Sequence, residues 1–188
     1  MKYNKLTASL FFSGMLLLSG CGSSSSSSST STQTPTTTQT PSSAAVLGST
    51  TIVTTSGKTI QVDKTAGGFI VRGYENKIVL LEVYGDNCPH CTAAIPAYNR
   101  LQAKYPNDVV IIALESTGSL SHAPEQQYIT VPRANTGNMF SFIREVTGYG
   151  LQAVPYLMIL DRNGDIVYDK ILANFPEDEI TSWIEQLK

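Results

Sequence analysis

Residues 78–91 read IVLLEVYGDNCPHC, an apolar run that leads into two closely spaced cysteines. The run contains a single acid and no alternation of polar residues, which is typical of a strand covered on both faces. Residues 91–105 predict a helix that ends before Pro106. Cys88 and Cys91 are therefore expected where a central strand passes into a helix.

Further strands and helices are expected on both sides of this segment. Residues 52–55 and 59–62, separated by Ser-Gly-Lys, predict a hairpin. The other expected elements are strands at 69–71, 108–114, 156–160 and 166–168, a helix at 138–146, and a C-terminal helix from Pro176. In the helix at 138–146 we expect Phe140, Ile143 and Val146 to face inwards. This order of elements predicts an α/β fold with a mixed central sheet flanked by helices.

The position of the cysteines favours thiol chemistry. A cysteine in the first turn of a helix lies near unpaired backbone N–H groups and the positive end of the helix dipole, which favour its thiolate. We expect Cys88 to be the nucleophile in disulfide exchange and Cys91 to be the resolving thiol. Pro89 and His90 would tune the pair. The Cys88–Cys91 disulfide would be the redox group, with no separate cofactor and no metal.

Two other roles for a C-x-x-C pair remain open at this point. A zinc site needs two further ligands, and the chain offers only His90 and His122 besides carboxylates. A structural disulfide is the other alternative, although so short a loop constrains little of the unfolded chain. We expect His122, in a polar loop, to be solvated.

Three features outside the C-x-x-C make residues 77–188 resemble thioredoxin-fold proteins. Glu82 lies six residues before Cys88, where thioredoxins carry a buried acid. Pro96 lies eight residues after the same cysteine, at the family's helix-kinking proline. The segment YGLQAVP is similar to the one that leads to the family's cis-proline, here Pro155. The resemblance implies a thioredoxin-like fold with an N-terminal β-hairpin and a modest insert before the cis-proline segment.

The resemblance also implies roles for individual residues. A carboxyl in an apolar strand loses its hydration, so the pKa of Glu82 should rise towards neutrality and let it exchange a proton with Cys91. A cis Pro155 would present the backbone of Val154 beside the disulfide, where a substrate chain can pair with it. We expect Tyr84 to line the rim of the site as a substrate contact.

Two branches of this family match different features. The Pro89-His90 dipeptide and the valine before Pro155 resemble DsbA, a strong oxidant. The insert at residues 116–138 is smaller than the helical domain of DsbA, and the hairpin and the acid are more similar to the TlpA/ResA group of extracytoplasmic reductants. That group usually has a tryptophan where this chain has Asn87. We favour a TlpA/ResA-like reductant, with a DsbA-like oxidant as the alternative.

The N-terminal residues predict export and lipid anchoring. Residues 1–20 begin with lysines, continue into a short apolar run and end in Leu-Ser-Gly before Cys21, which resembles the bacterial lipobox of a lipoprotein signal peptide. A lipid on Cys21 leaves two of the three cysteines to pair with each other. An ordinary signal peptide is the alternative. Residues 21–45 are rich in Ser and Thr and predict a disordered tether, followed by the folded domain at 46–188.

These features predict a protein of the bacterial cell envelope that faces the periplasm or another extracytoplasmic space. Its expected partners are thiols or disulfides of exported proteins, a membrane protein that donates or accepts electrons, and the membrane itself through the lipid. The net charge of −2 and the lack of a basic run exclude an obvious nucleic-acid-binding patch. A non-catalytic binding lipoprotein is the alternative class, against which the intact C-x-x-C argues.

Overall fold

The computed structural model describes residues 44–188. The predicted signal peptide, the lipidation of Cys21 and the tether as far as residue 43 lie outside the described residues. Within residues 44–188, no helix is both long and apolar enough to cross a membrane.

A mixed five-stranded sheet forms the centre of the fold, as predicted. Its strands are β4 (Ile78–Tyr84), β5 (Val109–Glu115), β6 (Ile129–Val131), β7 (Tyr156–Leu160) and β8 (Ile166–Ile171). They lie in the order β6-β5-β4-β7-β8, with β5 parallel to β4 and β6, and β7 antiparallel to β4 and β8. Strand β4 is therefore central, and all seven of its residues are buried.

A second, antiparallel sheet precedes the central one. Its strands are β1 (Gly48–Val53), β2 (Thr59–Lys64) and β3 (Phe69–Val71), in the order β1-β2-β3. The predicted hairpin is confirmed, and the short strand at 69–71 pairs with β2. Gly57 has a φ of 81° in the hairpin turn, a backbone conformation that glycine adopts without steric cost.

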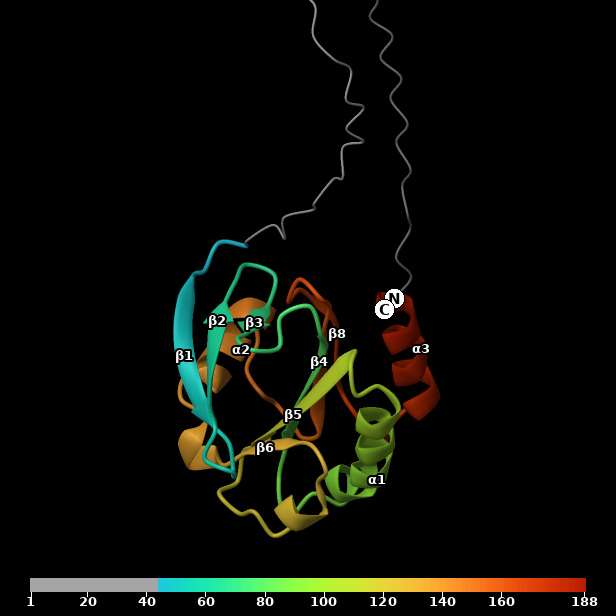
Figure 1. Ribbon diagram of the computed structural model, residues 1–188. Helices are drawn as coiled ribbons and strands as arrows, with labels where there is room; N and C mark the ends of the chain where they lie inside the picture. The colour runs from blue at the N-terminus through green and yellow to red at the C-terminus, as the bar shows by residue number, and fades with distance from the viewer. Residues whose placement is uncertain (1–43) are drawn as a thin grey trace, which may run out of the picture. The chain divides into compact units, whose positions relative to one another are not determined.

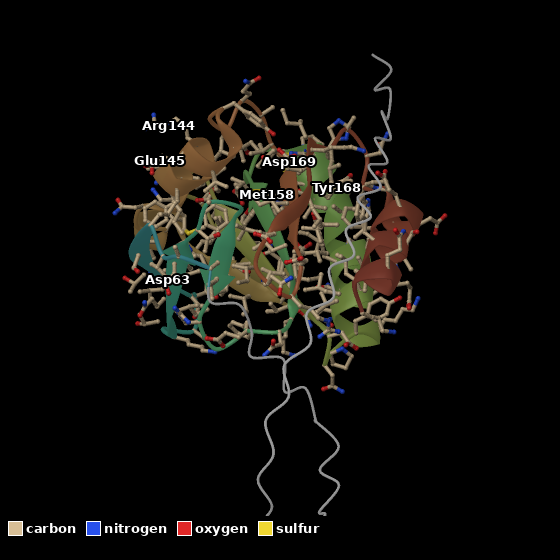
Figure 2. The ribbon with its side chains drawn as sticks, turned by 90° about the horizontal axis from the view of Figure 1, so that it is seen from above. Asp63, Arg144, Glu145, Met158, Tyr168 and Asp169 are labelled. Atoms are coloured by element: carbon tan, nitrogen blue, oxygen red, sulfur yellow. A yellow bond between two sulfur atoms is a disulfide. The ribbon has the colours of Figure 1, made fainter. Side chains whose placement is uncertain are left out.

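Helices and the small sheet cover opposite faces of the central sheet (Figure 1). Helices α1 (Pro89–Lys104) and α3 (Glu177–Leu187) pack on one face, while α2 (Met139–Thr147) and strands β1–β3 pack on the other. Met158 of β7 is buried on the side of the small sheet, and Tyr168 of β8 points towards α3 (Figure 2). The chain also forms two short 3-10 helices, Ala123–Glu125 and Arg133–Asn135.

The alternation of side chains along β4 decides what lies near the cysteines. Because successive strand residues point to opposite faces, Val79, Leu81 and Val83 join the core with the small sheet. Ile78 and Leu80 face α1 and α3 instead. Glu82 and Tyr84 continue this even-numbered series along the strand, so their side chains face α1 as well.

Three details differ from the sequence expectations. Helix α1 begins at Pro89 rather than at residue 91, because proline is favoured at the first helical position. The insert at 116–138 contributes strand β6, which adds to the sheet edge. Helix α2 buries Met139, Phe142 and Ile143, while Phe140 and Val146 are only partly buried, so its inner face is rotated from the expected one.

The described chain begins at the end of the sheet remote from the cysteines. Ala44 and Val46 line a cavity of about 220 Å³ together with Lys77 and Asp161. Lys77 precedes the first residue of β4, whereas Cys88 follows the last residue of that strand. The entry of the chain and the cysteine pair thus lie at opposite ends of β4.

Candidate redox site

The two cysteines are bonded to each other at the N-terminus of α1. Cys88 is the N-cap residue and Cys91 lies in the first turn, with their Cα atoms 5.2 Å apart. The exposed fraction of Cys88 is 9%, against 3% for Cys91. Cys88 is therefore the more exposed of the two cysteines, and its role as the sulfur that is attacked first stays a prediction.

The helix start provides a polar environment for Cys88 Sγ. The backbone N–H of Cys91 donates a hydrogen bond to this sulfur over 3.2 Å. The first turn of α1 contains no acidic residue, so the positive end of its dipole is not opposed there. Both features favour the thiolate of Cys88 once the disulfide is open. Pro89 and His90 are exposed between the two cysteines, where a partner can contact them.

The segment before β7 approaches the same sulfur. The Val154–Pro155 peptide bond is cis, as the sequence predicts. The carbonyl oxygen of Val154 lies 3.7 Å from Cys88 Sγ, and the side chain of Val154 packs against the cysteine pair. The backbone of Val154 is thus positioned beside the disulfide, although the two segments are 66 residues apart in sequence.

Glu82 is buried on the α1 side of β4. Its exposed fraction is 1%, and Oε1 has no hydrogen-bond partner among the described residues. Burial raises the pKa of Glu82 from 4.5 to about 8, an effect that the nearby Tyr98 hydroxyl partly opposes. The carboxyl is therefore neutral at pH 7. The expected burial of this acid is confirmed, and its proton exchange with Cys91 stays a prediction.

Tyr84 does not lie at the rim of the site, where the sequence analysis places it. Its exposed fraction is 2%, and its ring packs with Cys88, Cys91 and Ala113. The side-chain alternation of β4 directs Tyr84 inwards, beneath the disulfide, so its side chain is not offered to a substrate. Asn87, in the loop that follows, is exposed.

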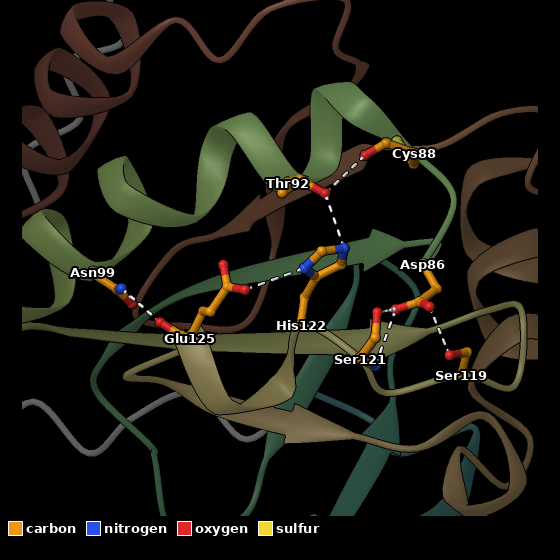
Figure 3. Close-up of polar contacts among 8 residues, drawn as sticks. All are labelled: Asp86, Cys88, Thr92, Asn99, Ser119, Ser121, His122 and Glu125. Carbon is orange, nitrogen blue, oxygen red and sulfur yellow. Dashed lines mark hydrogen bonds and ion pairs between the residues drawn. The ribbon is translucent and has the colours of Figure 1, made fainter.

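The insert after β5 is held against the loop before Cys88 (Figure 3). The Asp86 carboxylate accepts hydrogen bonds from the hydroxyls of Ser119 and Ser121, each over 2.6 Å, and from the Ser121 backbone N–H. These bonds lower the pKa of Asp86. The backbone N–H of Asp86 donates in turn to the Thr117 hydroxyl. Four polar contacts thus fix the insert to the loop that carries the disulfide.

A second group of contacts joins the insert to α1 (Figure 3). Nε2 of His122 lies 3.3 Å from the Thr92 hydroxyl, which donates to the carbonyl oxygen of Cys88. Nδ1 of His122 lies 3.4 Å from a carboxylate oxygen of Glu125, and Asn99 donates to the Glu125 carbonyl. The expectation of a solvated His122 is therefore wrong, because the insert folds back onto the helix.

Sequence analysis missed Thr92 and His122 as parts of the site. Thr92 lies four residues after Cys88, one helical turn away, which is a signal that could have placed it near the Cys88 carbonyl. No comparable signal exists for His122, since the path of the insert decides its contact. Within residues 44–188, no three ligating side chains gather into a potential metal site.

Comparisons with known proteins agree with this architecture. The Thioredoxin family model matches residues 59–135. A search of the curated proteins finds no match for the chain. Among solved structures, the exposed lipoprotein thioredoxin Etrx1 from Streptococcus pneumoniae superimposes with a TM-score of 0.55 and 16% identity, over 74% of this chain and 100% of that one.

Two further solved structures show a similar degree of likeness. The thioredoxin domain of a thiol-disulfide oxidoreductase from Bacteroides vulgatus has a TM-score of 0.53 and 11% identity, over 76% of this chain and 98% of that one. StoA from Bacillus subtilis has a TM-score of 0.52 and 16% identity, over 74% of this chain and 98% of that one. At these identities the likeness establishes the fold, which is the predicted thioredoxin-like α/β fold.

Proposed function

We propose that the protein is a thiol-disulfide oxidoreductase that acts on exported proteins through Cys88 and Cys91. The observation that carries the proposal is a bonded cysteine pair at a helix N-terminus, with the Val154 carbonyl oxygen 3.7 Å from the more exposed sulfur. A helix N-terminus stabilises the Cys88 thiolate, which makes this sulfur an effective leaving group in disulfide exchange. The backbone of Val154 is available to pair with an extended segment of the partner.

The exchange moves two electrons in two displacements. A thiolate of the partner attacks Cys88 Sγ, the bond between the two cysteines breaks, and the Cys91 sulfur leaves with the electron pair. A second thiolate of the partner then attacks the partner's sulfur in the mixed disulfide, and Cys88 leaves as a thiolate. The partner is oxidised to a disulfide and the cysteine pair is reduced to a dithiol, while the reverse sequence reduces a partner disulfide.

Glu82 supplies a proton for this reaction. When the disulfide opens, the Cys91 sulfur leaves as a thiolate in a nearly closed environment. Below pH 8 the buried carboxyl of Glu82 is neutral, and it donates its proton to that thiolate. The same carboxylate accepts the proton when Cys91 becomes the nucleophile in the reverse direction.

The N-terminal sequence supports a location at the outer face of a bacterial membrane. Residues 18–21 have the pattern of a lipobox, and we propose that Cys21 carries the lipid and residues 22–45 form the tether. The solved structure of an exposed lipoprotein thioredoxin shares the fold. A membrane protein that exchanges electrons with Cys88 and Cys91 would then regenerate the pair after each turnover.

The direction of electron flow is proposed from the size of the insert and from Glu82. The insert adds one short strand rather than a helical domain, and the acid beneath the pair is buried, which favours a TlpA/ResA-like reductant. A DsbA-like oxidant is the second candidate, because the Pro89-His90 dipeptide lies between the cysteines and no acid in the first turn of α1 weakens the thiolate.

A surface suited to protein substrates continues from the Val154 segment. Tyr149 and Ile171 are exposed by 40% and 49%, and both line a cavity of about 250 Å³ with Gln152 and Tyr156. Ile171 pairs with Tyr156, the residue after Pro155, so this cavity lies along the same segment as the Val154 backbone. We propose that it receives an apolar side chain of the partner.

The reduction potential of residues 46–188, equilibrated with glutathione, tests the proposal and its direction. A value near that of thioredoxin, about −270 mV, supports a reductant, and a value near that of DsbA, about −120 mV, supports an oxidant. The variant Cys88→Ser is the control, because it cannot form the mixed disulfide. Full thiol-exchange activity in that variant would overturn the role of Cys88, and a lack of exchange activity in the wild type would overturn the enzymatic proposal in favour of a binding protein.

A further inference from the structure

Among residues 44–188, buried side-chain polar atoms that lack a hydrogen-bond partner lie on the α1 side of the central sheet. They are Oε1 of Glu82 and the hydroxyls of Tyr84, Tyr98, Tyr128 and Tyr168. Buried polar groups in folded proteins nearly always have a hydrogen-bond partner, and each exception calls for a reason. One of these atoms belongs to an ionisable carboxyl, and an ionised Glu82 needs a hydrogen-bond donor that one of the neighbouring hydroxyls can provide.

Tyr98 is the tyrosine best placed to do this. It lies on α1 seven residues after Cys91, and both residues are on the buried face of that helix. Its side chain is fully buried in the core between α1 and β4, the face towards which Glu82 also points. The Tyr98 hydroxyl and Oε1 of Glu82 are both buried on this face and both lack a hydrogen-bond partner among residues 44–188, and the hydroxyl lowers the pKa that burial gives the carboxyl.

The insert supplies a second tyrosine to the same region. The ring of Tyr128 packs edge-on against that of Tyr98, with the ring centroids 5.6 Å apart. Tyr128 also packs against the cluster that contains Cys88, Cys91 and Tyr84. It therefore bridges the Tyr98 region and the cysteine pair, and it limits where the Tyr98 ring can lie.

We propose that Tyr98 is a positioning residue for disulfide exchange, whose hydroxyl donates a hydrogen bond to the Glu82 carboxylate after Glu82 has passed its proton to Cys91. This inference rests on the proposed function. In the transfer, the O–H bond of Glu82 breaks and the S–H bond of Cys91 forms, so the negative charge moves from sulfur to carboxylate. Tyr98 keeps its proton throughout and stabilises the charge in a place that water does not reach.

Other ionisable groups near Glu82 do not replace this donor. Tyr84 lies on the same strand, towards Cys88, and Tyr128 contacts Tyr98 through its ring. The buried Glu115, at the end of β5, is itself a carboxylate and already accepts hydrogen bonds from the Thr117 and Gly118 backbone N–H groups. A hydroxyl donor is thus the group that an ionised Glu82 requires.

The variant Tyr98→Phe tests the inference, because it removes the hydroxyl and keeps the ring. The titration of the Glu82 carboxyl is followed by carbon NMR on the oxidised protein, with Glu82→Gln to assign the signal. We expect the midpoint in Tyr98→Phe to lie about one pH unit above that of the wild type, since a hydrogen bond to a charged group is lost. The matched control is Tyr168→Phe, which removes another unpartnered buried hydroxyl and should leave the midpoint unchanged.

A kinetic measurement distinguishes positioning from packing. The rate of opening of the disulfide by dithiothreitol, divided by the thiolate concentration, should decline in the wild type as Glu82 ionises near pH 8. In Tyr98→Phe we expect a lower rate below the midpoint and a decline that starts at higher pH. An unchanged midpoint in both measurements would overturn the role of Tyr98. The proposed function fails by a different outcome, which is a wild type that catalyses no thiol-disulfide exchange.

Discussion

The hydroxyl oxygen of Thr92 lies 3.3 Å from Nε2 of His122 and joins the first turn of α1 to the insert that follows β5. The same hydroxyl donates to the carbonyl oxygen of Cys88. The side chain of Thr92 thus connects the backbone of Cys88 to His122, which lies 30 residues after Thr92 in sequence. The insert is therefore part of the structure that holds Cys88, and not a separate appendage.

Replacing Thr92 with valine removes both hydrogen bonds and keeps the shape of the side chain. We expect Thr92→Val and His122→Ala each to lower the free energy of unfolding by about 1 kcal/mol. The double variant should show a coupling of about 0.5–1 kcal/mol, because the two residues share one contact. Urea unfolding of the oxidised protein measures these values, with Thr181→Val on α3 as the control. Additive effects would show that the contact stabilises nothing.

The buried carboxyl of Glu82 makes stability depend on pH. The pKa of Glu82 is about 8 in the folded protein and 4.5 in the unfolded chain. At pH values between these two, the folded state therefore holds one more proton than the unfolded chain. The stability of the wild type should therefore fall as pH rises through this range, by up to about 1.4 kcal/mol per pH unit. Glu82→Gln does not titrate, and its stability relative to the wild type should increase from pH 5 to pH 8. If the unfolding free energies of the wild type and Glu82→Gln changed in parallel across this range, the raised pKa of Glu82 would be contradicted.

Serine variants of the two cysteines should differ in how much mixed disulfide they form with partner proteins. In Cys91→Ser the mixed disulfide between Cys88 and a partner cannot be resolved, so we expect covalent complexes that dithiothreitol releases. Cys88→Ser should trap far less, because Cys91 is nearly closed to solvent. Non-reducing gels and mass spectrometry of the complexes measure both outcomes. Equal trapping by the two variants would mean that the order of attack is wrong.

The exposed ring of Tyr149 should matter for protein substrates and not for small ones. We expect Tyr149→Ala to raise the KM for a protein disulfide by about fivefold with little change in kcat. The substitution removes apolar contact with the substrate, which contributes about 1 kcal/mol to the free energy of binding. The rate with a small aromatic disulfide should stay the same. Leu47→Ala removes another exposed apolar side chain, before β1, and is the matched control. A similar rise in KM in both variants would argue against a specific surface.

The sequence could predict those features that depend on local pattern. The apolar run with one acid located β4 and the burial of Glu82, and the step from this strand into a helix located Cys88 at the helix start. These two predictions succeed because hydrophobic periodicity and helix-start signals can be read from neighbouring residues. The cis-proline is expected from the resemblance of the YGLQAVP segment to thioredoxin-fold proteins, and the contact of Val154 with Cys88 depends on the pairing of β7 with β4.

Of the features that the sequence analysis missed, one follows from a local pattern and two do not. The inward position of Tyr84 follows from the alternation that also buries Glu82, so it could have been predicted by counting two residues along the strand. The contact of His122 with Thr92 could not, because a polar insert has many possible paths. The same holds for Tyr128, which precedes the three-residue strand β6 and reaches the cysteine pair only once that strand has joined the sheet edge.

The position of Ala44 gives the domain a definite polarity. The described chain enters beside the first residue of β4, and the disulfide follows the last residue of the same strand, which is about 20 Å further on. Because these two points lie at opposite ends of β4, residues 44–46 do not cover Cys88. A partner protein can therefore reach the disulfide without meeting the segment through which the described chain enters the domain.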